Sequence, residues 1–302
     1  MIYPPYLNAG DTIGFVAPAR KVNRTEMELA IRWWEEKGFR VEMGKHLFAE
    51  HFQYAGTDKE RIEDLQNMLD SSHIQAIFCA RGGYGTLRII DHLDFLGFKL
   101  EPKWICGFSD ITVLHSHIHK VCDIATLHST MPFSLNTKSE VNYESLFQNL
   151  IGQHPTYTCK PHELNRLGSC TAPLVGGNLS LLYALSGSIS EIDTTQKILF
   201  IEEVDEYLYH IDRMMLQLKR AGKLARLAGL LVGGFTKMRD NEIAFGSGFE
   251  QIIREHCEEY NFPIAFNFPA GHGDLNVAVK LGANYSLNVN VDKTSLIEKV
   301  SL

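Results

Sequence analysis

Features that would place this chain in several specialised classes are missing from it. The longest apolar run, around residues 227–235, is interrupted by glycines and falls far short of the ~20 residues that span a bilayer. The chain has 29 basic and 36 acidic residues, a net charge of −7, and no run rich in Lys and Arg. We therefore expect neither a nucleic acid nor a membrane as partner.

The cysteines and the first residues point to a reducing compartment. The six cysteines are scattered and form no Cys-x-x-Cys pair, which predicts buried thiols rather than disulfides or a metal site. Residues 1–5 have neither the basic region nor the apolar core of a signal peptide. The expected location is the cytoplasm.

What the sequence does contain is the pattern of a two-domain α/β protein. Its length of 302 residues corresponds to about two domains. Apolar runs predict parallel strands at residues 12–16, 39–43, 75–80 and 104–108, with amphipathic helical patterns after them. Residues 136–171 are polar and rich in turns, so we expect an N-terminal domain over 1–135, a connection over 136–171 and a C-terminal domain over 172–302.

The C-terminal half restarts with Gly176-Gly177-Asn178 and a helical pattern over 179–185. Apolar or alternating patterns predict further strands at 198–201, 230–235, 264–268 and 285–291. Because open parallel sheets bind ligands beyond the carboxyl ends of their strands, residues that follow predicted strands are the candidates for a site.

Two candidates lie in the first half. Gly107-Phe108-Ser109-Asp110 places a serine at a strand-to-helix turn, where free N–H groups could stabilise an oxyanion; the alternative is that Ser109 or Asp110 caps the helix. Arg81-Gly82-Gly83-Tyr84-Gly85 leaves backbone N–H groups bare for an oxyanion or a phosphate, or is only a tight turn.

Two more candidates lie in the second half. Glu202-Glu203 ends a strand, where a carboxylate could orient a histidine or belong to a solvated loop. Gly271-His272-Gly273 gives an imidazole the freedom that a general base needs. His115, His117 and His119 fall in a predicted helix, where only the first and last share a face, so a packed or solvated surface is favoured over a metal site.

Taken in register, these segments resemble the L,D-carboxypeptidase family of serine peptidases over nearly the whole chain. The matching stretches also include Gly10-Asp11-Thr12-Ile13-Gly14, Leu199-Phe200-Ile201 and Tyr209-x-Ile211-Asp212-Arg213. The resemblance implies that Ser109 is the nucleophile, His272 the general base and Glu202, rather than Glu203, the orienting carboxylate. It further implies an oxyanion hole made by the N–H groups of Gly83 and Asp110.

The same resemblance implies a Rossmann-like N-terminal domain, a β-rich C-terminal domain and a triad assembled between them. The expected substrate is a cytoplasmic murein tetrapeptide, cut before its terminal D-alanine without metal or organic cofactor. The alternatives are an aminoacyl-nucleotide antibiotic and, in another class, non-catalytic binding of a phosphate or nucleotide. A homodimer is possible by analogy, and Arg81, Tyr84 and Asn178 are candidates for substrate contact.

Overall fold

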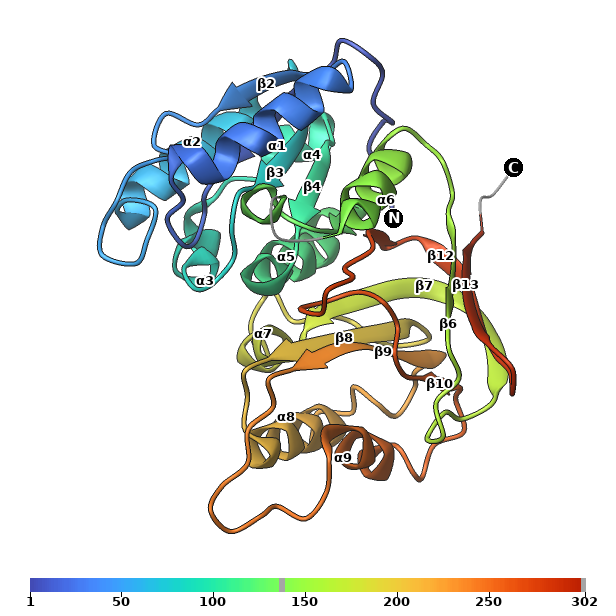
Figure 1. Cartoon of the computed structure of the whole chain (residues 1–302). Coiled ribbons are helices and arrows are strands. Elements are labelled where there is room, and N and C mark those ends of the chain that lie inside the picture. Colours follow the sequence, from blue (N-terminus) through green and yellow to red (C-terminus); the bar gives the residue numbers. More distant parts are fainter. Residues whose placement is uncertain (136–138, 300–302) are drawn as a thin grey trace.

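The protein, described here by a computed structural model over residues 1–135 and 139–299, contains two sheets flanked by helices (Figure 1). The strands of the first sheet are β1 (Thr12–Val16), β2 (Arg40–Met43), β3 (Ile74–Cys79), β4 (Trp104–Gly107), β5 (Thr126–His128) and β11 (Val279–Leu281). Their order is β11-β5-β4-β3-β1-β2. Strands β1 to β5 run parallel, whereas β11 pairs antiparallel to β5. The predicted Rossmann-like arrangement is confirmed.

Helices cover both faces of this sheet (Figure 1). They are α1 (Arg24–Glu36), α2 (Asp58–Asp70), α3 (Thr86–Ile89), α4 (Leu96–Leu100) and α5 (Thr112–Cys122). A capping box between Asn23 and Glu26 begins α1, satisfying backbone N–H groups that a helix start leaves without partners. The apolar face of α1, including Met27 and Trp34, is fully buried against the sheet, as its spacing predicts.

The second sheet is mixed. Its strands are β6 (Thr156–Cys159), β7 (Gly168–Asn178), β8 (Ile198–Val204), β9 (Gly229–Thr236), β10 (Ile264–Ala265), β12 (Asn284–Val289) and β13 (Thr294–Glu298). The order is β10-β9-β8-β7-β12-β13-β6, in which β7 to β10 are parallel and β12, β13 and β6 antiparallel. Helices α7 (Leu179–Ala184), α8 (Leu208–Arg220) and α9 (Phe249–His256) accompany it. This is the second, β-rich unit that the sequence predicts.

The segment expected to be an irregular connection contains regular structure. Helix α6 (Glu140–Leu150) buries Leu146 and Leu150 in the core beside the first sheet, while β6 is an edge strand of the second. Strand β11, from the C-terminal half, belongs to the first sheet. The predicted domain limits stay a prediction. In the structure, α6 and β6 come from the expected connection and pack with the first and second sheets, and β11 joins the first sheet from the C-terminal half.

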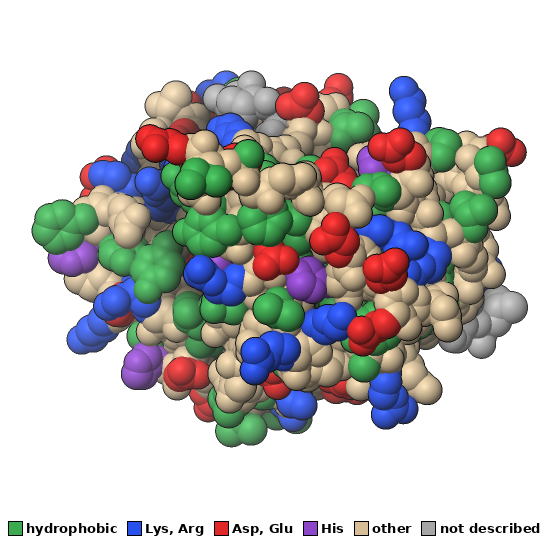
Figure 2. Space-filling model, turned by 90° about the horizontal axis from the view of Figure 1, so that it is seen from below, with side chains coloured by type: hydrophobic (Ala, Val, Ile, Leu, Met, Phe, Trp, Pro, Cys, Tyr) green, Lys and Arg blue, Asp and Glu red, His purple; other side chains and the backbone are tan. Residues whose placement is uncertain are grey.

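The surface carries charges of both signs. Over the face shown in Figure 2, Lys and Arg side chains are interspersed with Asp and Glu rather than gathered into one basic area. None of the helices within the described ranges combines the length and the apolarity needed to cross a bilayer.

Candidate active site

Ser109 lies on a sharp turn between a strand and a helix. Strand β4 ends at Gly107, and Ser109 begins a short 3-10 segment that leads directly into α5. The backbone φ of Ser109 is 62°, a left-handed conformation that costs energy for a residue with a side chain. Its side chain is largely buried, with 9% of the residue exposed. Such a strained turn is how nucleophile elbows present a serine hydroxyl, even though the Gly-x-Ser-x-Gly motif is absent.

His272 and Glu202 complete a line of hydrogen-bonding groups from the other sheet. The Nε2 atom of His272 lies 3.2 Å from Ser109 Oγ, and its Nδ1 atom lies 2.5 Å from Glu202 Oε2. Gly271 has a φ of +113°, and a β-carbon there would lie 2.7 Å from the Glu202 Cβ atom. Glycine before the histidine therefore allows the loop to pass directly over the carboxylate.

The two adjacent glutamates have different partners. The register between β8 and β9 shifts between Ile201 and Glu203, and Glu202 lies at that irregularity. Glu202 faces His272, whereas Glu203 accepts hydrogen bonds from Asn178 Nδ2 (2.9 Å) and from the N–H and hydroxyl of Ser180. In this geometry Glu202, and not Glu203, is the carboxylate that contacts His272.

Burial and charge separate the pKa values of these carboxyls. Burial raises the pKa of Glu202, but the adjacent His272 lowers it to a net value below the ordinary one. For Glu203, burial and the nearby charge of Glu202 both raise the pKa. Glu202 is thus held as the anion that an imidazolium needs beside it.

One predicted oxyanion donor, Asp110, directly follows the serine, and the other, Gly83, belongs to the glycine loop beside it. Gly82 packs so closely that a β-carbon there would lie 3.3 Å from Ser109 Oγ, and Gly83 follows it with a φ of +108°. Within residues 1–135 and 139–299, the N–H groups of Gly83 and Asp110 donate to no other group of the chain. The Asp110 carboxylate accepts from the N–H of Thr86 (2.8 Å), which fixes the glycine loop against the serine turn.

Several buried residues that the sequence reasoning did not single out support the His272 loop. Asn276 Oδ1 accepts the N–H of Gly271 (2.8 Å) and lies 3.0 Å from His128 Nε2, and its own N–H donates to Asn142 Oδ1 (2.8 Å). His128 ends β5, so a strand-end search could have found it. Burial lowers the pKa of His128 to about 4, which keeps its ring neutral.

A direct contact joins the two halves beside the triad. The N–H of Asn178, at the end of β7, donates to the Thr112 hydroxyl at the start of α5 (3.0 Å). Gly177 approaches the same side chain so closely that a β-carbon there would lie 2.5 Å from Thr112 Oγ1. The serine turn and the strand next to Glu202 are therefore in fixed contact.

The three candidates for substrate contact differ in whether other groups of the protein already bind their side chains. Arg81 forms an ion pair with Glu26 (3.6 Å) and stacks over the Phe133 ring, so its charge is already engaged. Tyr84 is 45% exposed. Asn178 is 3% exposed, and its amide both binds Glu203 and caps α7. These contacts argue against Asn178 and Arg81 as direct ligands and leave Tyr84 available.

The three helical histidines are packed inside the protein. His115 Nε2 lies 2.9 Å from the carbonyl oxygen of Gly107, and His119 Nε2 lies 3.0 Å from Thr126 Oγ1. His117 pairs with the hydroxyl of Ser190 (2.8 Å). Their ring nitrogens thus bind protein groups from separate elements. In the part of the chain that the structure describes, no three His, Cys, Asp or Glu side chains are grouped to hold a metal.

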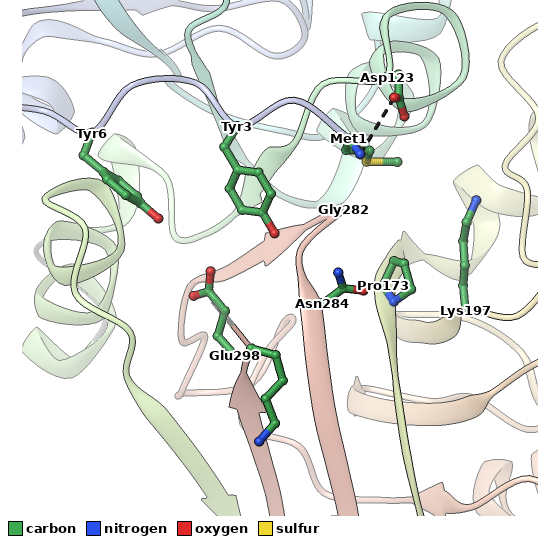
Figure 3. Close-up of a pocket in the computed structure, with 10 residues that line it drawn as sticks. Met1, Tyr3, Tyr6, Asp123, Pro173, Lys197, Gly282, Asn284 and Glu298 are labelled. Carbon is green, nitrogen blue, oxygen red and sulfur yellow. Dashed lines mark ion pairs between the residues drawn. The ribbon is translucent and has the colours of Figure 1, made fainter. Parts of the chain in front are cut away.

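A separate cavity of about 510 Å³ lies where the N-terminal segment meets the second sheet (Figure 3). Tyr3, Tyr6 and Glu298 line it together with the Met1–Asp123 ion pair. Behind Glu298, the fully buried Lys280 donates to its carboxylate at 2.9 Å. None of the triad residues borders this cavity.

The triad geometry is the arrangement that serine hydrolases use, with the nucleophile and its base supplied by two α/β units. Residues 13–129 match the LD-carboxypeptidase N-terminal domain and residues 171–287 match the LD-carboxypeptidase C-terminal domain. The chain belongs to the LD-carboxypeptidase family and is a serine-type carboxypeptidase.

Known proteins similar to this chain span almost its full length. The probable murein peptide carboxypeptidase of Bacillus subtilis strain 168 is 38% identical over 303 residues, covering 98% of this chain and 94% of the relative. The structure of muramoyltetrapeptide carboxypeptidase from Oxalobacter formigenes superposes with a TM-score of 0.88 at 23% identity, covering 96% and 99% of the two chains. The microcin C7 self immunity protein MccF, solved with aspartyl sulfamoyl adenosine, gives 0.88 at 20% identity and covers 99% of both. These two structures share the fold.

Proposed function

We propose that this enzyme hydrolyses the amide bond between an L-configured centre and the terminal D-alanine of cytoplasmic murein tetrapeptides, in peptidoglycan recycling. The observation that carries the proposal is the alignment of Ser109, His272 and Glu202 at 3.2 Å and 2.5 Å. The 38% identity to a probable murein peptide carboxypeptidase supports this substrate class.

The first half of the reaction acylates the serine. His272 Nε2 takes the proton of Ser109 Oγ as that oxygen attacks the scissile carbonyl carbon. The negative charge that develops on the carbonyl oxygen is stabilised by the N–H groups of Gly83 and Asp110, each worth about 3 kcal/mol. Buried Glu202 stabilises the imidazolium, which then protonates the nitrogen of the departing D-alanine.

The second half returns the enzyme to its starting state. D-Alanine leaves, and a water molecule takes its place beside His272. The imidazole removes a proton from that water as its oxygen attacks the acyl carbon. His272 then gives the proton to Ser109 Oγ, and the shortened peptide departs with a free carboxylate.

The test compares the wild-type enzyme with Ser109→Ala on a murein tetrapeptide carrying a terminal D-alanine. We expect the wild type to release D-alanine and the variant to lose at least about 10⁴ in kcat while still binding the peptide. Equal turnover by both proteins would contradict a serine nucleophile.

A second candidate substrate is an aminoacyl sulfamoyl nucleoside. It is favoured by the full-length structural likeness to MccF, whose complex contains aspartyl sulfamoyl adenosine. A side-by-side assay distinguishes the two, because our proposal requires turnover of the tetrapeptide and not of the nucleoside. A non-catalytic binding protein would turn over neither.

A further inference from the structure

An enzyme that removes one C-terminal residue has to recognise a free carboxylate close to the bond it cuts. A single α-carbon separates the scissile nitrogen from that carboxylate in the departing residue. The group that binds it must therefore lie within about one residue's length of the oxyanion loop, Gly82-Gly83, or roughly 3.5 Å of chain. Arginine suits this role because its guanidinium binds a carboxylate through two parallel hydrogen bonds.

Most cations around this loop already have acidic partners. Arg81 pairs with Glu26 at 3.6 Å, and the Lys21 ammonium lies 2.6 Å from the carboxylate of Glu50. Arg88 donates from Nε and Nη2 to the carboxylate of Asp58 on α2. Their charges are balanced within the protein, so none of them presents an unshared cation to a substrate.

Arg20 is different. It follows β1 at the carboxyl edge of the first sheet, and its N–H donates to the carbonyl oxygen of Gly82 (3.3 Å). Its side-chain stem lies against Gly83, where a β-carbon would come within 2.8 Å of Arg20 Cδ. The residue is exposed, and among the described residues its guanidinium has no hydrogen bond or ion pair.

The backbone of Arg20 is held on two sides. Besides the hydrogen bond to Gly82, it forms an isolated antiparallel bridge with Tyr54. A fixed backbone and a supported stem reduce the entropy lost when the guanidinium binds an anion. The cation is therefore pre-positioned next to the loop that contacts Ser109, since the neighbouring Gly82 lies against that serine.

We propose that Arg20 binds the free terminal carboxylate of the substrate and so makes the enzyme a carboxypeptidase rather than an endopeptidase. This inference rests on the proposed function and specifies the group that recognises the terminal carboxylate of the peptide. Arg20 acts in place of Arg81, which the sequence suggested for that contact.

The experiment uses two peptides that differ only at their end: an L,D-tetrapeptide with terminal D-alanine and the same peptide with D-alaninamide. Arg20→Gln should lower kcat/KM for the acid by roughly 10- to 100-fold, mainly through KM, because a hydrogen bond to a charged group is lost. Its rate on the amide should fall by no more than about threefold, because that peptide lacks the charge. Arg20→Lys should be intermediate, since an ammonium keeps the charge but not the paired geometry.

Lys21→Gln is the matched control, because it removes a neighbouring positive charge that is already paired on the surface. It should change the ratio of acid to amide rates by less than about twofold. Calorimetric titration of both peptides into Ser109→Ala, with and without Arg20→Gln, measures binding separately from turnover. Ser109→Ala should bind the acid more tightly than the amide, and Arg20→Gln should remove that difference.

The outcomes separate the two proposals. A wild-type enzyme that releases no D-alanine refutes the proposed function, while the titrations still decide the role of Arg20. Equal binding of acid and amide by Ser109→Ala, no binding of either, or an unchanged preference after Arg20→Gln overturns the inference. It is equally overturned if Arg81→Gln, and not Arg20→Gln, abolishes the preference.

Discussion

Replacing Glu202 by glutamine tests the central geometry of the site. The substitution keeps the size of the side chain but removes its charge, 2.5 Å from His272 Nδ1 and with none of the residue exposed. A carboxylate accepts the Nδ1 proton and so leaves Nε2 free to take the proton of Ser109. A glutamine can turn its NH₂ group towards the ring and favour the opposite tautomer, which cannot act as the base.

The expected loss in kcat is about 10⁴-fold, the size found when the equivalent charge is removed from a Ser-His-Asp triad. At about 1.36 kcal/mol per factor of ten, this is about 5.5 kcal/mol of transition-state stabilisation. The effect should appear in kcat rather than in KM, because Glu202 acts through the histidine and does not reach the substrate.

The assay is steady-state release of D-alanine at neutral pH, with circular dichroism to show that the variant is folded. Glu203→Gln is the matched control on the adjacent position. It should destabilise the fold by about 1–3 kcal/mol, because one oxygen that accepts hydrogen bonds becomes a donor. Its kcat should stay within about tenfold of wild type, since it does not contact His272.

A folded Glu202→Gln enzyme that keeps more than about a tenth of the wild-type kcat would refute this reasoning. So would a Glu203→Gln enzyme that loses as much kcat as Glu202→Gln. Either result would place the orienting carboxylate elsewhere.

Two further predictions concern stability. Burial raises the pKa of Glu202, but His272, His128 and Asn178 together lower it below its ordinary value of 4.5. The ionised form therefore stabilises the fold above pH 4.5, and this contribution is lost as pH falls through the lower folded-state pKa. Urea unfolding should therefore show the gap between wild type and Glu202→Gln narrowing at acid pH, and a constant gap would contradict this. Lys280→Met should destabilise the fold by at most about 3–5 kcal/mol, because the buried Glu298 carboxylate loses its lysine and keeps the partly exposed His154 as an ion-pair partner. Thermal or urea unfolding measures this loss, and adding Glu298→Leu should recover much of it; no recovery would show that the pair itself is not the cause.

The candidate site could be located from the sequence because the ends of predicted strands are recognisable from local patterns. Ser109, Glu202 and His272 each follow or end an apolar run, and parallel strands bring such ends to one edge of a sheet. The structure brings the three side chains together from β4, β8 and the loop before β11. The separations of the three residues along the chain do not predict the distances between their side chains.

The sequence was less informative where contacts between distant segments decide the structure. Strand β7 contains Pro173 and several glycines, so its composition does not resemble a strand, yet it pairs with both β8 and β12. Helix α6 was missed because its sequence is largely polar, although Leu146 and Leu150 are buried. The engagement of Arg81 by Glu26 on α1 depends on tertiary packing, which local patterns do not specify.

Strand β11 has a consequence for how the protein is made. It lies beside β5, the strand next to β4 and the nucleophile turn, although it comes from residues 279–281. On the ribosome, the first sheet therefore remains incomplete at that edge until residues 279–281 have been synthesised. A nascent or truncated product that ends after the first half would carry Ser109 but lack both His272 and the strand that completes the first sheet. We therefore expect hydrolytic activity only once the chain has been synthesised through β11.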